Sequence, residues 1–216
     1  MHIYDIPKPV SQGEFGSLHT ANSRMEKITD VLRRKTTCSI HDEKLQACTE
    51  ADKGLLWKEQ RVAEQIAKVN NCWYPIDEVF NIGAMGPSGS ENDTYISLKF
   101  GEIYKVNNLT HCGLLSDYFQ RLIWHNQLFY ETMYEFVGFT GFEQRSVFPI
   151  VKQQLIDNFP ATADLIEAHL QNLGFKKTIN NHWFNETFEI WDVVPKNAMT
   201  DINGTIYVID AEIRKL

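Results

Sequence analysis

The chain has 216 residues, of which 43% are hydrophobic and 23% charged, a composition that excludes collagen-like, coiled-coil and wholly disordered chains. Lys and Arg number 21 and Asp and Glu number 28, so the formal net charge is −7, the wrong sign for non-specific binding to a nucleic-acid backbone. We therefore expect a folded, soluble protein that does not bind nucleic acid directly.

The amino-terminal third predicts an arm followed by two helices. Residues 1–23 show little periodicity, which predicts an extended or poorly ordered arm outside the core. From Ser23, apolar residues at helical spacing predict a first helix, and the same pattern over residues 45–69 predicts a second. Asn70 and Asn71 provide a stop signal for the second helix.

The rest of the chain predicts a small antiparallel sheet with a helix, then a mixed segment. Strands are predicted over residues 77–83, 94–100 and 102–108, and the glycine-rich stretch GAMGPSGSEND joins the first two. A helix over 114–129 precedes a hairpin of 134–142 and 146–156. A short helix over 162–173 ends at Gly174, and WFNETFEIWDVV and GTIYVIDAEI predict a strand, a loop and a strand with a turn at Asn203-Gly204. The predicted fold class is α+β.

Cysteine spacing and hydropathy indicate the cellular setting. The cysteines form no C-x-x-C pair, so we expect reduced, buried or half-buried thiols rather than a zinc or redox site: Cys38, Cys48, Cys72 and Cys112. No stretch approaches the about 18 apolar residues of a membrane span, and the amino terminus lacks a signal-peptide pattern. We expect a cytoplasmic, bacterial-type protein with no membrane partner, and the sequence leaves a homodimer open.

The most informative spacing lies near the carboxyl terminus. Asp192 and Asn197 are five positions apart, and Asp210 lies thirteen beyond Asn197. This pattern, D-V-V-P-K-N followed by a hydrophobic hairpin ending in I-D-A, resembles the catalytic loop and metal-binding strand of the protein-kinase-like superfamily. The resemblance implies that Asn197 and Asp210 bind metal through hard oxygen ligands, and that Asp192 is the catalytic residue that orients the attacking hydroxyl. Met199 would form an apolar floor beneath adenine.

An upstream segment fits the same arrangement. Gly83, Gly86 and Gly89 lie between two predicted strands, and Lys105 lies inside the apolar strand segment EIYKVNN. By resemblance, the glycine loop would cover a triphosphate while Lys105 contacts its α- and β-phosphates. Two alternatives remain open from the residues alone. The glycines could form an ordinary turn, because G-A-M-G-P-S-G is not G-x-G-x-x-G, and Lys105 could lie on the outward side of an alternating strand.

Taken in order, these segments most closely resemble the kinase domain of bacterial polyvalent proteins encoded by mobile elements, from residue 74 to residue 214. RSVFPIVKQQLI resembles the strand that enters the inter-lobe hinge, so backbone groups around Gln153 would meet the adenine edge. The resemblance implies a minimal protein-kinase-like bilobal core over residues 74–216, with a truncated C-lobe, preceded by a helical extension over residues 1–73. The implied cofactors are ATP and Mg²⁺.

Several features depart from the pattern. Ile190-Trp191 stands where His-Arg commonly precedes the catalytic Asp, and Asp210-Ala211-Glu212 replaces D-F-G. The acidic partner of the lysine is open among three residues, Asp117, Glu131 and Glu135. The few residues after Asp210 leave no room for an activation segment, so we expect no conventional platform for a peptide substrate.

Three hypotheses follow. The favoured one is an ATP- and Mg²⁺-binding kinase-like protein that transfers the γ-phosphoryl group to an unidentified acceptor, protein or small molecule. The second is a catalytically inactive kinase-like module that binds nucleotide or protein partners for a mobile element. The third is a mixed α+β domain in which Asp192 and Asn197 only shape turns through side-chain bonds to the backbone.

Overall fold

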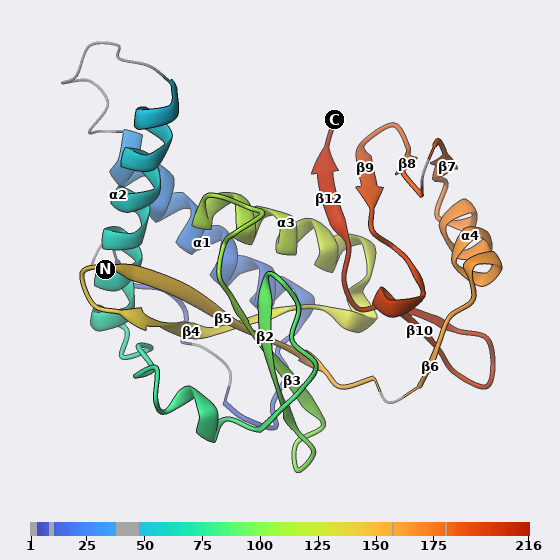
Figure 1. The fold of residues 1–216 in the computed structure, drawn as a ribbon, viewed down its shortest axis with the longest axis horizontal. Coiled ribbons are helices and arrows are strands. Elements are labelled where there is room, and N and C mark those ends of the chain that lie inside the picture. The colour runs from blue at the N-terminus through green and yellow to red at the C-terminus, as the bar shows by residue number, and fades with distance from the viewer. Residues whose placement is uncertain (1–3, 9–10, 38–47, 157, 180) are drawn as a thin grey trace. The chain divides into compact units, whose positions relative to one another are not determined.

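A computed structural model describes residues 4–8, 11–37, 48–156, 158–179 and 181–216, without the side chains of residues 48–53. Cys38 and the first residues of the second predicted helix lie outside this part. The chain divides into two compact units, one of Met1–Ile123 with Tyr134–Gln154 and the other of Trp124–Met133 with Leu155–Leu216. Each unit is described by itself below (Figure 1).

The predicted helices of the first unit are confirmed. They are α1 (Leu18–Thr37), α2 (Cys48–Val69) and α3 (Leu115–Leu128), whose first residues, up to position 123, belong to this unit. The first helix begins earlier than the apolar pattern indicates because the Ser17 hydroxyl accepts a hydrogen bond from the Thr20 N–H and so caps it. After α2, Asn71 adopts a left-handed φ of 52°, which ends the helix where the sequence predicted.

The sheet of the first unit has five strands in the order β1-β2-β3-β5-β4, and every neighbouring pair is antiparallel. The strands are β1 (Ala84–Met85), β2 (Asn92–Ser97), β3 (Glu102–Asn107), β4 (Glu135–Phe142) and β5 (Ser146–Gln154). Thr94, Lys105 and Val151 are cross-strand partners on β2, β3 and β5, so their side chains share one face of the sheet.

The strand predicted over residues 77–83 is wrong. The backbone N–H groups of Glu78 and Val79 both donate to the Pro75 carbonyl, at 2.9 and 3.3 Å. These bonds close a turn that continues as the 3₁₀ turn η2 (Val79–Asn81). The first strand of the sheet is consequently the two-residue β1, which begins after Gly83.

One hydrophobic core joins the helices to the sheet face that bears Val151. Phe119 of α3 packs edge-to-face against Phe136 and Phe139 of β4, with ring centroids 5.6 and 6.1 Å apart. The same cluster contains residues of the first two helices, so both sides of the predicted boundary at residue 73 contribute to one core. That boundary stays a prediction.

The amino-terminal arm is not outside the core, contrary to the expectation from its low periodicity. Ile6 is buried in the helix–sheet core. On β5, Lys152 donates to the carbonyl oxygens of Ser11 and Glu14, at 2.9 and 2.6 Å, and pairs with Glu102 at 2.6 Å. Polar bonds to the buried Lys152–Glu102 ion pair therefore hold residues 11–16 against the sheet. Apolar periodicity in the sequence does not reveal contacts of this kind.

The second unit contains one complete helix, α4 (Ala163–Asn172), and two small antiparallel sheets. Thr162 caps the start of α4, and Gly174, with φ +83°, follows its end as predicted. One sheet has the order β11-β10-β6 and the other β12-β9-β8-β7. The strands are β6 (Phe159–Pro160), β7 (Lys176–Lys177), β8 (Trp183–Phe184), β9 (Phe188–Trp191), β10 (Ala198–Thr200), β11 (Ile206–Val208) and β12 (Glu212–Lys215).

The segment GTIYVIDAEI is not one strand. It forms β11 and β12, which belong to different sheets of the second unit. The break occurs because the N–H groups of Ile209 and Asp210 both turn to the Asn197 carbonyl, at 2.9 and 3.3 Å. The turn predicted at Asn203-Gly204 is confirmed, since Asp201 accepts the N–H groups of Asn203 and Thr205 and Gly204 has φ +82°.

Over the described ranges, none of the helices is long and apolar enough to cross a membrane.

Candidate active site

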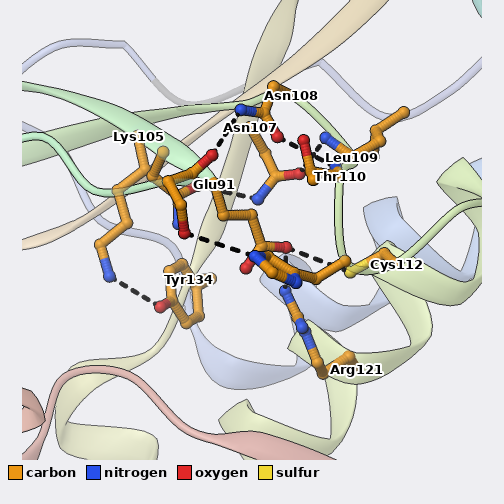
Figure 2. Close-up of polar contacts among 12 residues, drawn as sticks. Glu91, Lys105, Asn107, Asn108, Leu109, Thr110, Cys112, Arg121 and Tyr134 are labelled. Carbon is orange, nitrogen blue, oxygen red and sulfur yellow. Dashed lines mark hydrogen bonds and ion pairs between the residues drawn. The ribbon is translucent and has the colours of Figure 1, made fainter.

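Lys105 is buried in β3 with 7% of its surface exposed, so the outward-facing alternative is wrong. Its Nζ donates a hydrogen bond of 2.8 Å to the Tyr134 hydroxyl and lies 4.9 Å from the centroid of the same ring (Figure 2). Because Val151, its cross-strand partner, belongs to the helix–sheet core, Lys105 lies on the helix-covered face. The sequence placed this lysine correctly inside an apolar strand.

The candidate acids have other contacts. Asp117 lies 3.7 Å from Arg33, and Glu135 accepts the Gly16 N–H and lies 3.9 Å from Arg24. Burial raises the pKa of Glu135 above 4.5, and the Gly16 N–H and nearby cations only partly offset this effect. Glu131 belongs to the second unit and is exposed. The sequence does not indicate Tyr134, because an acid is the usual partner of a buried lysine and a phenol 29 positions away carries no spacing signal.

The glycine-rich segment forms the hairpin between β1 and β2. The N–H groups of Gly86 and Gly89 donate to the carbonyls of Thr94 and Asn92, at 2.9 and 3.0 Å. A Cβ at Gly83 would lie 2.5 Å from the Ile96 carbonyl oxygen, and one at Gly86 2.7 Å from the Thr94 hydroxyl. These two glycines are thus needed for close contact with β2, whereas Gly89 faces open space.

The hairpin adjoins Lys105 in the sheet. Gly86 bonds to Thr94, and Thr94 is the cross-strand partner of Lys105. The Thr94 hydroxyl donates to the Pro87 carbonyl at 2.7 Å, and the Thr94 side chain lies on the Lys105 face. The glycine-rich turn therefore bends toward the face that carries the buried ammonium.

An ion pair ties this hairpin to α3. Glu91, just before β2, accepts a hydrogen bond from Arg121 at 2.9 Å, and the two side chains are only 14% and 11% exposed. The same carboxylate oxygen accepts the Cys112 thiol at 3.4 Å, and the Glu91 carbonyl accepts the Asn108 N–H at 2.9 Å (Figure 2). The sequence did not predict this pair. An arginine on the buried side of α3 could have indicated it, because a buried arginine is usually paired with an acid.

Gln153 lies in β5 opposite Ile103 of β3, and its side chain is buried. The strand ends at Gln154, where the first unit also ends. The position of this strand end is compatible with the hinge that the sequence predicted, but an adenine contact at Gln153 stays a prediction.

A hollow of about 490 Å³ lies on the other face of the same sheet. Tyr104, which precedes Lys105 and so points to the opposite side, lines it together with Ser11 and Gln12 of the arm. Among the described residues, the lining includes none of the predicted site residues.

In the second unit, the loop from Asp192 to Asn197 is closed by side-chain bonds. The Asn197 Nδ2 donates to both the carbonyl oxygen and the carboxylate of Asp192, at 2.8 and 2.9 Å. Lys196 Nζ lies 3.7 Å from the same carboxylate. These bonds shape the turn, as the third hypothesis expects. Because the nitrogen and the oxygen of an amide point in different directions, they also direct the Asn197 amide oxygen away from Asp192.

Asp210 is held beside this loop by its own backbone. The Asn197 carbonyl accepts the N–H groups of Ile209 and Asp210, which joins the last residue of the 3₁₀ turn η4 (Pro195–Asn197) to the chain after β11. Both side chains are partly exposed. The structure therefore brings the backbone of Asp210 next to the loop of Asp192 and Asn197, and the metal-binding and catalytic roles of these residues stay predictions.

Met199 follows two positions later in β10 and pairs with Tyr207 of β11 and Pro160 of β6. The Met199 side chain is partly exposed. Its assignment as a floor for adenine stays a prediction.

A buried polar pair supports β11 from within the second unit. Thr132 donates its hydroxyl hydrogen to the Val208 carbonyl, two positions before Asp210. His125 lies 3.3 Å from the same hydroxyl through Nε2 and is itself buried. His125 is thus a packed residue in this unit.

The donor set suits a magnesium ion shared with a phosphate. An amide oxygen from Asn197 and a carboxylate from Asp210 are hard ligands, and Mg²⁺ is usually bound by one or two protein carboxylates plus substrate phosphates and water. In the described ranges, no three His, Cys, Asp or Glu side chains gather into a self-sufficient metal site. Asn197 and Asp210 are the residues that would hold such an ion together with the phosphates of a substrate.

A buried lysine beside a glycine-rich hairpin, on an antiparallel sheet, together with this oxygen-bearing loop, is compatible with a small kinase-like α+β fold. A family described as Serine/Threonine/Tyrosine Kinase found in polyvalent proteins matches residues 57–215, most of the chain, and the chain belongs to that family. No curated protein and no solved structure matches it.

The family match begins within α2, earlier than the resemblance drawn from the motifs alone. Within the matched part of α2, the Glu59 carboxylate accepts both the N–H and the hydroxyl of Ser116, at 3.0 and 2.6 Å. These bonds cap the first turn of α3. Part of α2 is therefore a support for the helix that carries Arg121.

Proposed function

We propose that the protein binds ATP with Mg²⁺ and transfers the γ-phosphoryl group to a hydroxyl group of an acceptor. The observation that carries the proposal is the arrangement of Asp192, Asn197 and Asp210 around one closed loop, in a chain of a kinase family. The family's description, which names serine, threonine and tyrosine kinases, supports a hydroxyl acceptor.

In this proposal the first unit binds the phosphates. Lys105 donates hydrogen bonds to the α- and β-phosphates, because a buried ammonium is a strong partner for phosphate oxygens. The hairpin that bears Gly83, Gly86 and Gly89 covers the phosphates from the same face. Since two of the three glycines are already packed against β2, the hairpin is preorganised and loses little freedom when nucleotide binds. Gln153 and Met199 are assigned to the adenine.

In the second unit, the side-chain oxygens of Asn197 and Asp210 would hold Mg²⁺. The bound ion would neutralise phosphate charge and fix the direction of the γ-phosphate. No third protein ligand is needed, because phosphate oxygens and water complete the coordination.

Asp192 orients the acceptor and receives its proton. The acceptor oxygen forms a bond to the γ-phosphorus while the bond to the bridging oxygen of ADP breaks, and the hydroxyl proton passes to the Asp192 carboxylate. The Asn197 Nδ2, at 2.9 Å, and the Lys196 Nζ, at 3.7 Å, hold this carboxylate in position.

Incubation of the protein with γ-labelled ATP, Mg²⁺ and a host lysate tests the proposal. We expect label on the acceptor with wild type and its loss with Lys105→Met, while Lys99→Met, an exposed lysine before the turn to β3, keeps full transfer. In the same buffer, MgATP at 100 times its dissociation constant should stabilise the protein by about 2.7 kcal/mol. Absence of both transfer and thermal stabilisation would refute the proposal.

A further inference from the structure

The Lys105–Tyr134 contact differs from an ion pair in its charge. A Tyr hydroxyl accepts a hydrogen bond from an ammonium while remaining neutral, and it keeps a hydrogen of its own to donate. A carboxylate in the same place would bring a full negative charge to the ammonium. The contact at 2.8 Å therefore restrains the position of Nζ through a hydrogen bond to a neutral group.

Tyr134 is built to hold that position. It is 2% exposed, belongs to the helix–sheet core and immediately precedes β4, whose pairing with β5 begins at Glu135. Its ring also faces the ammonium, with Nζ 4.9 Å from the centroid. Both the hydroxyl and the ring thus limit where the amine can lie, and Figure 2 shows the Lys105 and Tyr134 side chains pointing toward one another.

We propose that Tyr134 is a positioning residue for Lys105, whose hydroxyl and ring orient the ammonium for its contact with the phosphates. The inference rests on the proposed nucleotide binding and adds a residue that the motifs do not contain. Tyr134 itself does not touch the substrate in this account, since it acts through Lys105.

Calorimetric titration of the full chain with MgATP and, separately, with adenosine tests this role. We expect Tyr134→Phe, which keeps the ring, to weaken MgATP binding about tenfold, the size of one lost hydrogen bond to a charged group, and to leave adenosine binding unchanged. Tyr130→Phe removes an exposed phenol hydroxyl of the neighbouring turn and should bind both ligands like wild type. Urea midpoints of all variants report folding.

A double-mutant cycle with Lys105→Met separates positioning from structure. If Tyr134 acts through the lysine, adding Tyr134→Phe to Lys105→Met causes no further loss of MgATP affinity. Equal MgATP affinity in Tyr134→Phe and wild type, parallel losses for MgATP and adenosine, or fully additive losses in the cycle would each overturn the inference. A wild-type protein that binds no MgATP would instead refute the proposed function, and the inference with it.

Discussion

Asp192 has a left-handed backbone conformation, with φ 58°, that side-chain-bearing residues seldom adopt. Asp tolerates this conformation better than most residues, and here the two bonds from Asn197 hold it in place. Strained residues of this kind are enriched at functional sites, where the surrounding structure maintains them. Asn71, which ends α2, has a similar φ of 52°, so the left-handed conformation describes the shape of the loop, and the catalytic role of Asp192 stays a proposal.

Replacing Asp192 by Asn separates catalysis from binding. The amide oxygen of Asn can still accept from Asn197, so we expect the free energy of unfolding to change by less than about 0.5 kcal/mol. Loss of the proton acceptor should lower the rate of phosphoryl transfer about 100-fold or more while the dissociation constant of MgATP stays within twofold. Urea unfolding, transfer assays and calorimetry measure the three quantities. Transfer at the wild-type rate would show that Asp192 has no role in proton transfer.

The residues of the site were predictable to different degrees. Asp192, Asn197 and Asp210 could be named as candidates because they lie within one short stretch, and their roles stay predictions. Lys105 could be found because a charged residue inside an apolar strand stands out. Tyr134 could not, since its contact with Lys105 depends on how β3 and β4 lie in the sheet, which local sequence does not determine.

At the scale of elements, the helices were easier to predict than the strands. Amphipathic periodicity over many turns identified α1, α2, α3 and α4, whereas the short apolar run at residues 77–83 fits a strand and a turn equally well. This run forms a turn rather than a strand because the Pro75 carbonyl accepts two backbone N–H groups. The single strand predicted over GTIYVIDAEI is likewise interrupted, because the Asn197 carbonyl accepts the N–H groups of Ile209 and Asp210. The local sequence does not indicate this tertiary contact.

The contact through which Glu59 of α2 caps α3 should contribute to stability. Glu59→Ala leaves the Ser116 N–H and hydroxyl without their partner, so the free energy of unfolding should fall by about 1–3 kcal/mol. Chemical denaturation measures the change. Glu26→Ala, at an exposed position of α1, serves as the control and should alter stability by less than about 0.5 kcal/mol. A similar effect of both substitutions would show that Glu59 does not cap α3.

The ion pair between Glu91 and Arg121 should hold the glycine-rich hairpin in place. Glu91→Arg alone places two cations together in a mostly buried site and should weaken MgATP binding, since the hairpin that covers the phosphates would lose its anchor. The exchange Glu91→Arg with Arg121→Glu restores opposite charges and should recover part of the affinity. Calorimetry of the single and double variants measures the recovery. A double variant no better than the worse single variant would argue against the coupling.

For the whole molecule, the sequence predicted the class of fold and the order of its segments, but not how the amino-terminal residues pack. An apolar stripe on a helix shows that the helix packs on something, not which element it meets. The first two helices therefore looked like an extension, although they share a core with the sheet. The docked arm depends on Lys152, whose burial beside Glu102 no periodicity reveals.

Buried carboxylates should make the stability of the protein depend on pH. Burial raises the pKa of Glu59 and of Glu135 above their ordinary value of 4.5. The folded protein therefore binds more protons than the unfolded chain just above pH 4.5, so these groups make the free energy of unfolding decrease as the pH rises through that window. Urea unfolding between pH 4.5 and 7 should show a steeper decrease for wild type than for Glu135→Gln. Parallel curves would contradict this assignment.

Calorimetric titration with ATP, with and without Mg²⁺, tests the proposed metal-assisted triphosphate site at Asp210 most directly. We predict that wild type binds ATP tightly only when Mg²⁺ is present and that Asp210→Ala loses this dependence together with most of the affinity. Asp164→Ala, at an exposed acid in the first turn of α4, should bind like wild type. Equal, Mg²⁺-dependent binding of ATP by wild type and Asp210→Ala would contradict the assignment of Asp210 as a metal ligand.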